Sequence, residues 1–360
     1  MKKMIPFALI SLASLLSSCT VSFGLSSKNT SSSKGDVSSE DKSSYVDSSS
    51  EGTPASSETS SSSSSKPVSS SKPTSSTTPL PSSSSAPTSS PIAASSSSSS
   101  STSGYVPSGY SLKWSDEFEG SSLNSSYWTA QLGDGTDYGI TGWGNSEAEC
   151  YTANNATVGS GELKITAKKE TASASGHSYN YTSSRLRTAG KITTTYGYVE
   201  ARIKLPAIQG MWPAFWMLPE GTYQSKGWPT SGELDIMENK GREPNIVGGT
   251  THSANDSYAD VYHTESYTLS SSIENWHVYA MEWTSEAVKF SADGHVYNTV
   301  TRSTWVNGCS LYNGGPAPFN APFHIILNLA VGGQYDGYQM PPDNFVSAAM
   351  EVDYVRIYQQ

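Results

Sequence analysis

Cysteine and charge are both scarce in this chain of 360 residues, which has three cysteines and 15% charged residues. Hydrophobic residues make up 35% of the sequence, below the ~45–50% of an ordinary globular protein. The deficit is local, because residues 25–104 contain 39 serines and no tryptophan, whereas all nine tryptophans lie in 105–360. The first 104 residues therefore have too little apolar surface for a core of their own, which excludes two globular domains.

Basic residues are also few in the part that can fold. Of the 22 basic and 32 acidic residues, 15 and 26 fall in 105–360, which leaves a net charge of about −11 there. A negative domain repels phosphate and sulfate backbones at long range. We therefore expect no nucleic-acid partner, and a neutral polymer is the easier ligand to accommodate.

Two hydrolase motifs are missing as well. The chain contains no Gly-x-Ser-x-Gly sequence, so it offers no nucleophile elbow for a serine hydrolase. Its six histidines include no His-x-x-x-His pair of the kind that binds a catalytic zinc ion. Neither serine nor metal hydrolysis is supported.

The N-terminus predicts export. Lys2 and Lys3 precede an apolar run over 4–16 that is too short to span a bilayer as an ordinary helix. The run ends in Leu16-Ser17-Ser18-Cys19, which resembles a bacterial lipoprotein cleavage box and makes residues 1–19 a lipoprotein-type signal peptide with the lipid on Cys19. An ordinary cleavage site beside a chance cysteine is the alternative. We expect a protein exported to the bacterial cell surface and held on the membrane through the lipid alone.

Residues 20–104 form a serine-rich segment with scattered proline, threonine, lysine and glutamate. Such a composition predicts a disordered linker, which would let an anchored domain reach beyond the cell envelope. We interpret it as a spacer without a binding role of its own.

A two-residue period dominates 105–360. Apolar and polar residues alternate over 196–205 and 323–331, and Asp293-Gly294 within 288–300 is a strong hairpin signal. Further strands are expected at 162–167, 276–283 and 352–358. No stretch keeps a helical period over three turns, so the sequence predicts one all-β domain, a two-sheet sandwich or jelly roll.

Three carboxylates lie within six residues, at Glu233, Asp235 and Glu238. Glu233 and Asp235 share one face of a strand, and a single bulge residue before Glu238 would bring the third acid to that face. An acidic pair on a strand is often only a solvated face, but the intervening positions here are apolar, as in a strand packed on a core. Crowded carboxyls raise at least one pKa, as a general acid requires. The spacing predicts the paired acids of a retaining glycosidase.

These residues resemble glycoside hydrolase family 16, and within it the laminarinase-like bacterial endo-β-1,3-glucanases. The similarity runs from Trp114-Ser115-Asp116-Glu117-Phe118 to 352–358 and includes segments at 142–147, 181–185, 210–217, 233–238 and 323–333. It implies a curved, concanavalin A-like jelly roll with a cleft on its concave face. It also implies double displacement on a neutral β-glucan by a monomer, with no cofactor for catalysis.

The resemblance implies a role for each matching residue. Glu233 matches the nucleophile, Glu238 the acid/base, and Asp235 the auxiliary carboxylate between them. The implied substrate contacts are Asn145, Glu147, Arg185, Trp212, Trp216 and His252. Glu149 stands where many relatives have glutamine, and Cys150 where tyrosine is frequent.

A structural calcium ion is also implied by the resemblance, held by backbone carbonyls of Glu117 and Gly161 and by Asp353. The alternative is that Asp353 only pairs with a nearby cation. Cys150 and Cys309 are an even pair in an exported domain, and they either form a disulfide or remain two buried thiols.

Other functions stay open at this point. A mixed-linkage β-1,3-1,4-glucan (lichenan) or a red-algal galactan would suit the same chemistry, although the negative domain disfavours sulfated galactans. A non-catalytic carbohydrate-binding sandwich would share the fold but would have no use for the three acids.

Overall fold

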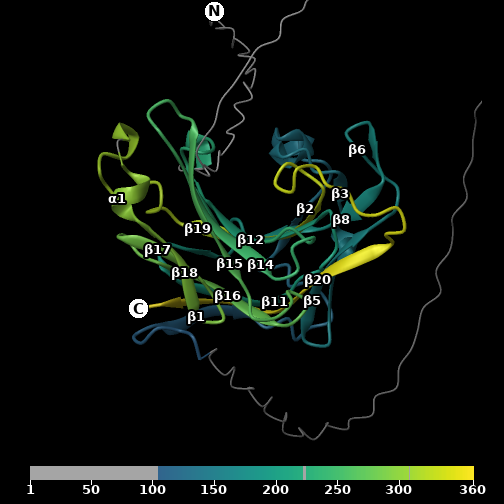
Figure 1. The fold of residues 1–360 in the computed structure, drawn as a ribbon, viewed down its shortest axis with the longest axis horizontal. Coiled ribbons are helices and arrows are strands. Elements are labelled where there is room, and N and C mark those ends of the chain that lie inside the picture. The colour runs from purple at the N-terminus through teal and green to yellow at the C-terminus, as the bar shows by residue number, and fades with distance from the viewer. Residues whose placement is uncertain (1–103, 222–223, 308) are drawn as a thin grey trace, which may run out of the picture. The chain divides into compact units, whose positions relative to one another are not determined.

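The computed structural model describes residues 104–360, apart from 222–223 and 308 (Figure 1). The predicted signal peptide, the lipidated Cys19 and the predicted linker up to residue 103 lie outside the described residues. No helix in the described part of the chain is long and apolar enough to cross a membrane.

Two large sheets lie face to face, and the fold is the all-β jelly-roll sandwich that the sequence predicts (Figure 1). The ten-stranded sheet has the order β18 (His295–Thr301), β17 (Ala287–Ala292), β16 (His277–Trp283), β11 (Gly197–Lys204), β20 (Ser347–Gln359), β5 (Glu162–Lys168), β8 (Tyr181–Ser183) and β3 (Glu149–Tyr151). Two more strands join it, β1 (Ser111–Asp116) beside β20 and β4 (Ala156–Gly159) beside β5.

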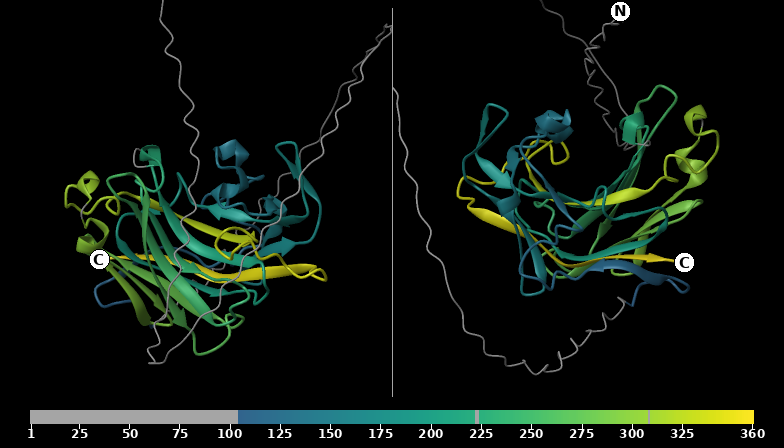
Figure 2. Two further views of the ribbon diagram at one scale, coloured as in Figure 1. Left: turned by 45° about the horizontal axis from the view of Figure 1, so that its top comes forward. Right: turned by 180° about the vertical axis from the view of Figure 1, so that it is seen from behind.

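The eight-stranded sheet forms the inner, concave layer, with loops rising on either side of it (Figures 1 and 2). Its order is β15 (Asp260–Thr268), β14 (Ile246–Ala254), β13 (Glu233–Glu238), β12 (Met211–Pro219), β19 (Phe323–Val331), β9 (Arg185–Arg187) and β2 (Thr129–Gln131), and β10 (Thr193–Thr194) pairs with β19. Among the described strand pairs only β3 and β8 run parallel.

Little else is regular. A small hairpin consists of β6 (Ala172–Ala174) and β7 (His177–Tyr179). Helical structure in the described part is limited to short turns: α1 (Arg302–Trp305), η1 (Thr136–Tyr138), η2 (Thr141–Gly144), η3 (Ala153–Asn155), η4 (Gln224–Lys226) and η5 (Ser310–Tyr312). The prediction that the domain contains no long helix, which follows from the absence of a helical period in the sequence, is therefore confirmed for the described residues.

The predicted strands are present. The alternating segment at 196–205 becomes β11, and the segment at 323–331 becomes β19. Asp293 and Gly294 join β17 to β18 with positive φ angles of 49° and 78°, as a tight two-residue hairpin turn requires. The strands expected at 162–167, 276–283 and 352–358 correspond to β5, β16 and part of β20.

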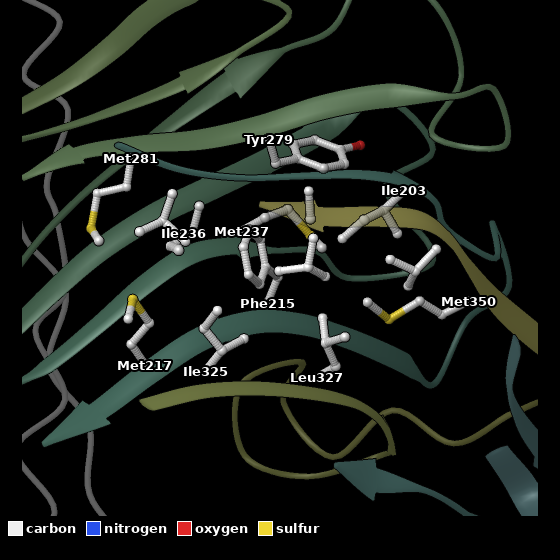
Figure 3. Packing of buried hydrophobic residues seen from close by; sticks show 14 of the residues in the cluster. Ile203, Phe215, Met217, Ile236, Met237, Tyr279, Met281, Ile325, Leu327 and Met350 are labelled. Carbon is white, nitrogen blue, oxygen red and sulfur yellow. The ribbon is translucent and has the colours of Figure 1, made fainter. Parts of the chain in front are cut away.

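The core lies between the two sheets. Figure 3 shows Ile203, Tyr279, Met281 and Met350 of the outer sheet facing side chains from β12, β13 and β19. Fully buried residues from these inner strands are Phe215, Met217, Leu234, Ile236, Met237, Ile325 and Leu327. Because the apolar side chains of β13 point into this core, its acidic side chains face the opposite, concave side.

Candidate active site

A bulge in β13 puts the three predicted carboxylates on one face. Asp235 pairs with Thr250 of β14, but Glu238 pairs with Gly248, so three residues of β13 span two of its neighbour. The register against β12 shifts at the same place. The extra residue sends both Ile236 and Met237 into the core (Figure 3). The predicted bulge is confirmed, and it returns Glu238 to the face of Glu233 and Asp235.

His252, on the adjacent strand β14, lies among the acids. Its Nε2 atom is 3.3 Å from Asp235 Oδ2 and 4.0 Å from Glu233 Oε1, while its Nδ1 atom is 3.0 Å from Asp260 Oδ2. Burial opposes protonation, but the hydrogen bonds to Asp235 and Asp260 outweigh it and raise the pKa of His252 to about 11. His252 is therefore an imidazolium ion at neutral pH, and its charge offsets part of the charge of the acids.

Glu238 accepts a hydrogen bond from the indole Nε1–H of Trp212 at 2.9 Å. Burial and the charge of Asp235 raise the pKa of Glu238 to about 8, although the bond from Trp212 opposes the shift. A carboxyl that still holds its proton at neutral pH can act as a general acid. Trp212 itself is only 9% exposed, so this tryptophan orients Glu238 and presents little of its ring as a sugar platform.

The pKa of Glu233 depends on the charges of its neighbours. Burial and the charge of Asp235 raise the pKa of Glu233, and the charge of His252 opposes this shift. The charge of His252 favours the ionised forms of both Glu233 and Glu238, and its Nε2 atom lies 4.0 Å from Glu233 Oε1. The two glutamates therefore interact with the same cation, and Glu238 in addition accepts the hydrogen bond from Trp212.

Arg185 of β9 is held between two tryptophan rings. Its guanidinium lies 4.6 Å from the ring centre of Trp216 and 4.7 Å from that of Trp143, and its Nε–H donates to Gln131 Oε1 at 2.8 Å. Arg185 is 4% exposed, so it acts on its neighbours mainly through its charge, which stabilises the ionised forms of Glu233 and Glu147.

The predicted contacts Asn145 and Glu147 lie together. Asn145 Nδ2 donates to Glu147 Oε1 at 3.4 Å, and the Tyr151 hydroxyl donates to Glu147 Oε2 at 2.8 Å. A backbone bridge between Glu147 and Gly332 places this loop beside the end of β19. Asn328 is on the same strand, β19, and its Oδ1 atom accepts a hydrogen bond from Trp216 Nε1–H at 2.7 Å. This bond connects Trp216 of β12 to β19 at the centre of the inner sheet.

A cavity of about 430 Å³ lies beyond Trp212, whose ring stacks on Tyr335 with centroids 5.0 Å apart. The cavity is lined by Lys240, Arg242, Tyr335, Asp336, Gly337 and Gln339. The charge of Lys240 favours the ionised form of Glu238, which places this cavity within electrostatic reach of the acid.

Sequence reasoning missed several of these residues. Asp260 reaches His252 only because β15 pairs with β14 in one particular register, and nothing in its local sequence marks it. Tyr335, Tyr151 and Asn328 are likewise brought in by the tertiary fold. The positions of Trp143 and Trp216 around Arg185 also depend on strand pairing between β9 and β19.

The residues of the predicted calcium site are near one another in the sheet. Val352 pairs with Leu163, so Asp353 lies close to the turn that contains Gly161, and the carboxylate of Glu119 also lies beside Gly161. Oxygen donors of this kind suit Ca²⁺. In the structure, however, Asp353 Oδ2 pairs with Arg202 Nη1 at 2.7 Å, and the Glu117 carboxylate pairs with Arg356. A cation would share Asp353 with Arg202.

Cys150 and Cys309 are separate, buried thiols. The Sγ atom of Cys309 lies 3.1 Å from the carbonyl oxygen of Ala254, whereas that of Cys150 lies 3.9 Å from the carbonyl oxygen of Tyr151. Of the two alternatives for this pair, the structure has the one without a disulfide.

Three carboxyls gathered on the concave face of a β-sandwich, beside tryptophan and arginine, are the arrangement of a glycoside hydrolase. The family described as β-porphyranase A–D, GH16 domain, matches residues 111–360. The chain belongs to glycoside hydrolase family 16.

Known proteins resemble the same region. The chain is 39% identical over 257 residues to a β-glucanase of Rhodothermus marinus, covering 69% of this chain and 85% of that protein. It is 38% identical to glucan endo-1,3-β-glucosidase A1 of Niallia circulans over 70% of this chain, but spans only 38% of that longer protein. The crystal structure of the Pyrococcus furiosus endo-β-1,3-glucanase is 43% identical, with a TM-score of 0.63 over 69% of this chain and 94% of that one.

Proposed function

We propose that residues 105–360 form a retaining endo-β-1,3-glucanase that hydrolyses laminarin-type glucan. The observation that carries the proposal is the bulge in β13, because it sets Glu233 and Glu238 on one face with different surroundings. Relatives named endo-1,3-β-glucanases support the choice of linkage.

The first step forms a covalent intermediate. Glu233 attacks the anomeric carbon while Glu238 gives its proton to the glycosidic oxygen, so the bond to the departing sugar breaks as the glycosyl–carboxylate bond forms. Asp235 Oδ2 lies 3.3 Å from Nε2 of the His252 imidazolium, and this cation stabilises the ionised form of Glu233. The cavity beyond Trp212 offers room for the departing sugar.

The second step releases the product. Glu238, now ionised, takes a proton from a water molecule whose oxygen attacks the anomeric carbon, and Glu233 leaves as a carboxylate. The hydrogen bond from Trp212 stabilises the ionised form of Glu238 that this step needs. Two inversions give retention at the anomeric carbon.

The charge of the domain favours a neutral substrate. With a net charge of about −11 on residues 105–360, a sulfated galactan is repelled at long range, whereas an uncharged glucan is not. The chemistry of the site would cleave either polymer, so the charge of the domain is the feature that favours the glucan.

The test compares laminarin, lichenan, a β-1,4-glucan and porphyran as substrates for the purified domain. We expect cleavage of laminarin above all, with the β-anomer as the first product in proton NMR spectra, and no turnover by Glu233→Gln as the control. An α-anomer as first product contradicts the mechanism, faster cleavage of porphyran contradicts the substrate, and binding without cleavage returns the domain to a carbohydrate-binding role.

We also propose that the full chain is a lipoprotein of the bacterial cell surface, on the strength of the Leu16-Ser17-Ser18-Cys19 sequence. Labelling with a radioactive fatty acid in a bacterial host should mark the full chain and leave Cys19→Ser unmarked. Equal labelling of both contradicts the anchor.

A structural Ca²⁺ bound by the carbonyls of Glu117 and Gly161 and by Asp353 is a further proposal, supported by the oxygen donors gathered around Gly161. Excess calcium should raise the melting temperature over that in a chelator, and Asp353→Asn should abolish the difference. Equal melting temperatures of the unmodified domain with and without calcium contradict the site.

A further inference from the structure

Glu149, in β3, is a completely buried carboxyl with one oxygen left over. Its Oε2 atom accepts the backbone N–H of Val331 at 2.7 Å, and its side chain is 0% exposed. Within the described part of the chain, its Oε1 atom has no donor. A buried, ionised oxygen without a donor is costly, whereas a protonated one can donate a hydrogen bond itself.

The neighbour able to accept that hydrogen bond is Glu147. The two side chains hydrogen-bond to each other, and Glu147 is also buried, at 6% exposure. Tyr151 and Asn145 already donate to Glu147, so Glu147 is the acceptor of the pair and Glu149 must supply the proton. Two carboxyls in contact do not both ionise easily.

We propose that Glu149 is a positioning residue that stays protonated during catalysis and donates its O–H to Glu147, which fixes the Glu147 carboxylate for a sugar hydroxyl. The role of Glu147 as a substrate contact rests on the proposed function. A protonated carboxyl offers one donor and one acceptor, as an amide does, which explains how glutamate can stand where many relatives have glutamine.

The hydrogen-bond directions support this assignment. Tyr151 donates to Glu147 and accepts from Asn328 Nδ2 at 3.1 Å, and Asn328 in turn accepts from the indole of Trp216. With a proton on Glu149, each polar group along this network, from the Val331 amide to the Trp216 indole, has a hydrogen-bond partner. The proton thus completes a network that ends at a predicted sugar-contact tryptophan.

The charges around the pair agree with one shared proton. Burial and the charge of Glu147 raise the pKa of Glu149 well above its usual range. Burial raises the pKa of Glu147 as well, but the charge of Arg185 opposes that shift and favours its ionised form, so Glu147 is the member of the pair with a cation to balance its charge. The other titratable groups within electrostatic range are Tyr151, Cys150, Tyr179 and, through Cys150, Asp134. Loss of the proton at alkaline pH would leave two carboxylates in contact and loosen Glu147.

The protonation state can be measured without substrate. An infrared difference spectrum at pH 7 between the unmodified domain and Glu149→Gln should show the loss of one protonated carboxyl band. Glu351→Gln is the matched control, because Glu351 is an ionised partner of Lys164 and Lys204 and its removal should leave that band unchanged. An unchanged band in Glu149→Gln overturns the proposal, even if the domain has another substrate.

The positioning role is tested by kinetics on laminarin oligomers. Glu149→Leu removes the donor, and we expect KM to rise about tenfold with a smaller change in kcat. Glu149→Gln should restore a low KM and should remove its rise at alkaline pH, because an amide does not titrate. An unchanged KM in Glu149→Leu, or an alkaline rise that persists in Glu149→Gln, overturns the role. If the leucine variant does not fold, the glutamine variant alone decides.

Discussion

The imidazolium of His252 lies among three acids, Glu233, Asp235 and Asp260, and its charge offsets part of theirs. It favours the ionised forms of both Glu233 and Glu238, whereas burial and the charge of Asp235 raise the pKa of both glutamates. At the residue scale, therefore, burial and neighbouring charges keep Glu238 protonated at neutral pH, as a general acid requires.

Glutamine variants separate the two glutamates. Glu233→Gln removes the proposed nucleophile and should lower kcat on laminarin at least about 10³-fold while binding is retained. Glu238→Gln should lower it by about 10²–10⁴-fold, but should spare the first step with an aryl glycoside whose leaving group needs no proton. Asp235→Asn should cost less than Glu233→Gln. If Glu238→Gln slows both substrates equally, Glu238 is not the acid.

The hydrogen bond from Trp212 should influence the pH above which activity falls, because it lowers the pKa of Glu238. Since Glu238 must hold a proton and its pKa is about 8, kcat/KM should fall as the pH rises through about 8. Trp212→Phe removes a donor that favours the ionised form, so the pKa of Glu238 should rise and the alkaline limb should move to higher pH. Trp216→Phe is the control, because its indole donates to Asn328 instead. A shift of the limb to lower pH in Trp212→Phe contradicts this role.

At the scale of single elements, the sequence allowed β13 to be predicted closely. Three acids with apolar residues between them required a bulge before Glu238, and the strand has it. The Asp293-Gly294 turn could be predicted equally well, because its geometry depends on those two residues alone. In contrast, the contact between His252 and Asp260 depends on the register of β14 against β15, and the hydrogen bond of Trp212 to Glu238 depends on β12 beside β13. Such contacts between strands carry no local signal.

Strand β14 offers a test of how tightly the two sheets pack. A Cβ atom on Gly249 would lie 2.7 Å from both Phe290 Cγ and Tyr297 Oη, so Gly249→Ala should lower the free energy of unfolding by about 1–3 kcal/mol. At the adjacent Gly248 the nearest atom would be at 3.6 Å, so Gly248→Ala should change it little. Urea unfolding of both variants is the measurement, and equal stability of the two contradicts close packing at Gly249.

At the scale of the whole domain, the free thiols test how the catalytic unit is held together. Cys150 is in β3 of the outer sheet, whereas Cys309 packs with Ala254 and Tyr312 in a separate small cluster. Burial raises the pKa of both thiols, so both favour the unreactive protonated form. The packing of the two sheets, without a covalent link, therefore has to stabilise the domain.

Reaction of residues 105–360 with a thiol reagent measures whether Cys150 and Cys309 are free. The folded domain should react slowly, because Cys150 and Cys309 are 5% and 7% exposed, and the denatured, non-reduced domain should give two thiols per chain. Cys150→Ser and Cys309→Ser should each give one thiol, and a reducing agent should leave the melting temperature unchanged. Zero thiols after denaturation, with a melting temperature that falls on reduction, would instead show a disulfide that closes a long loop, typically worth about 2–4 kcal/mol.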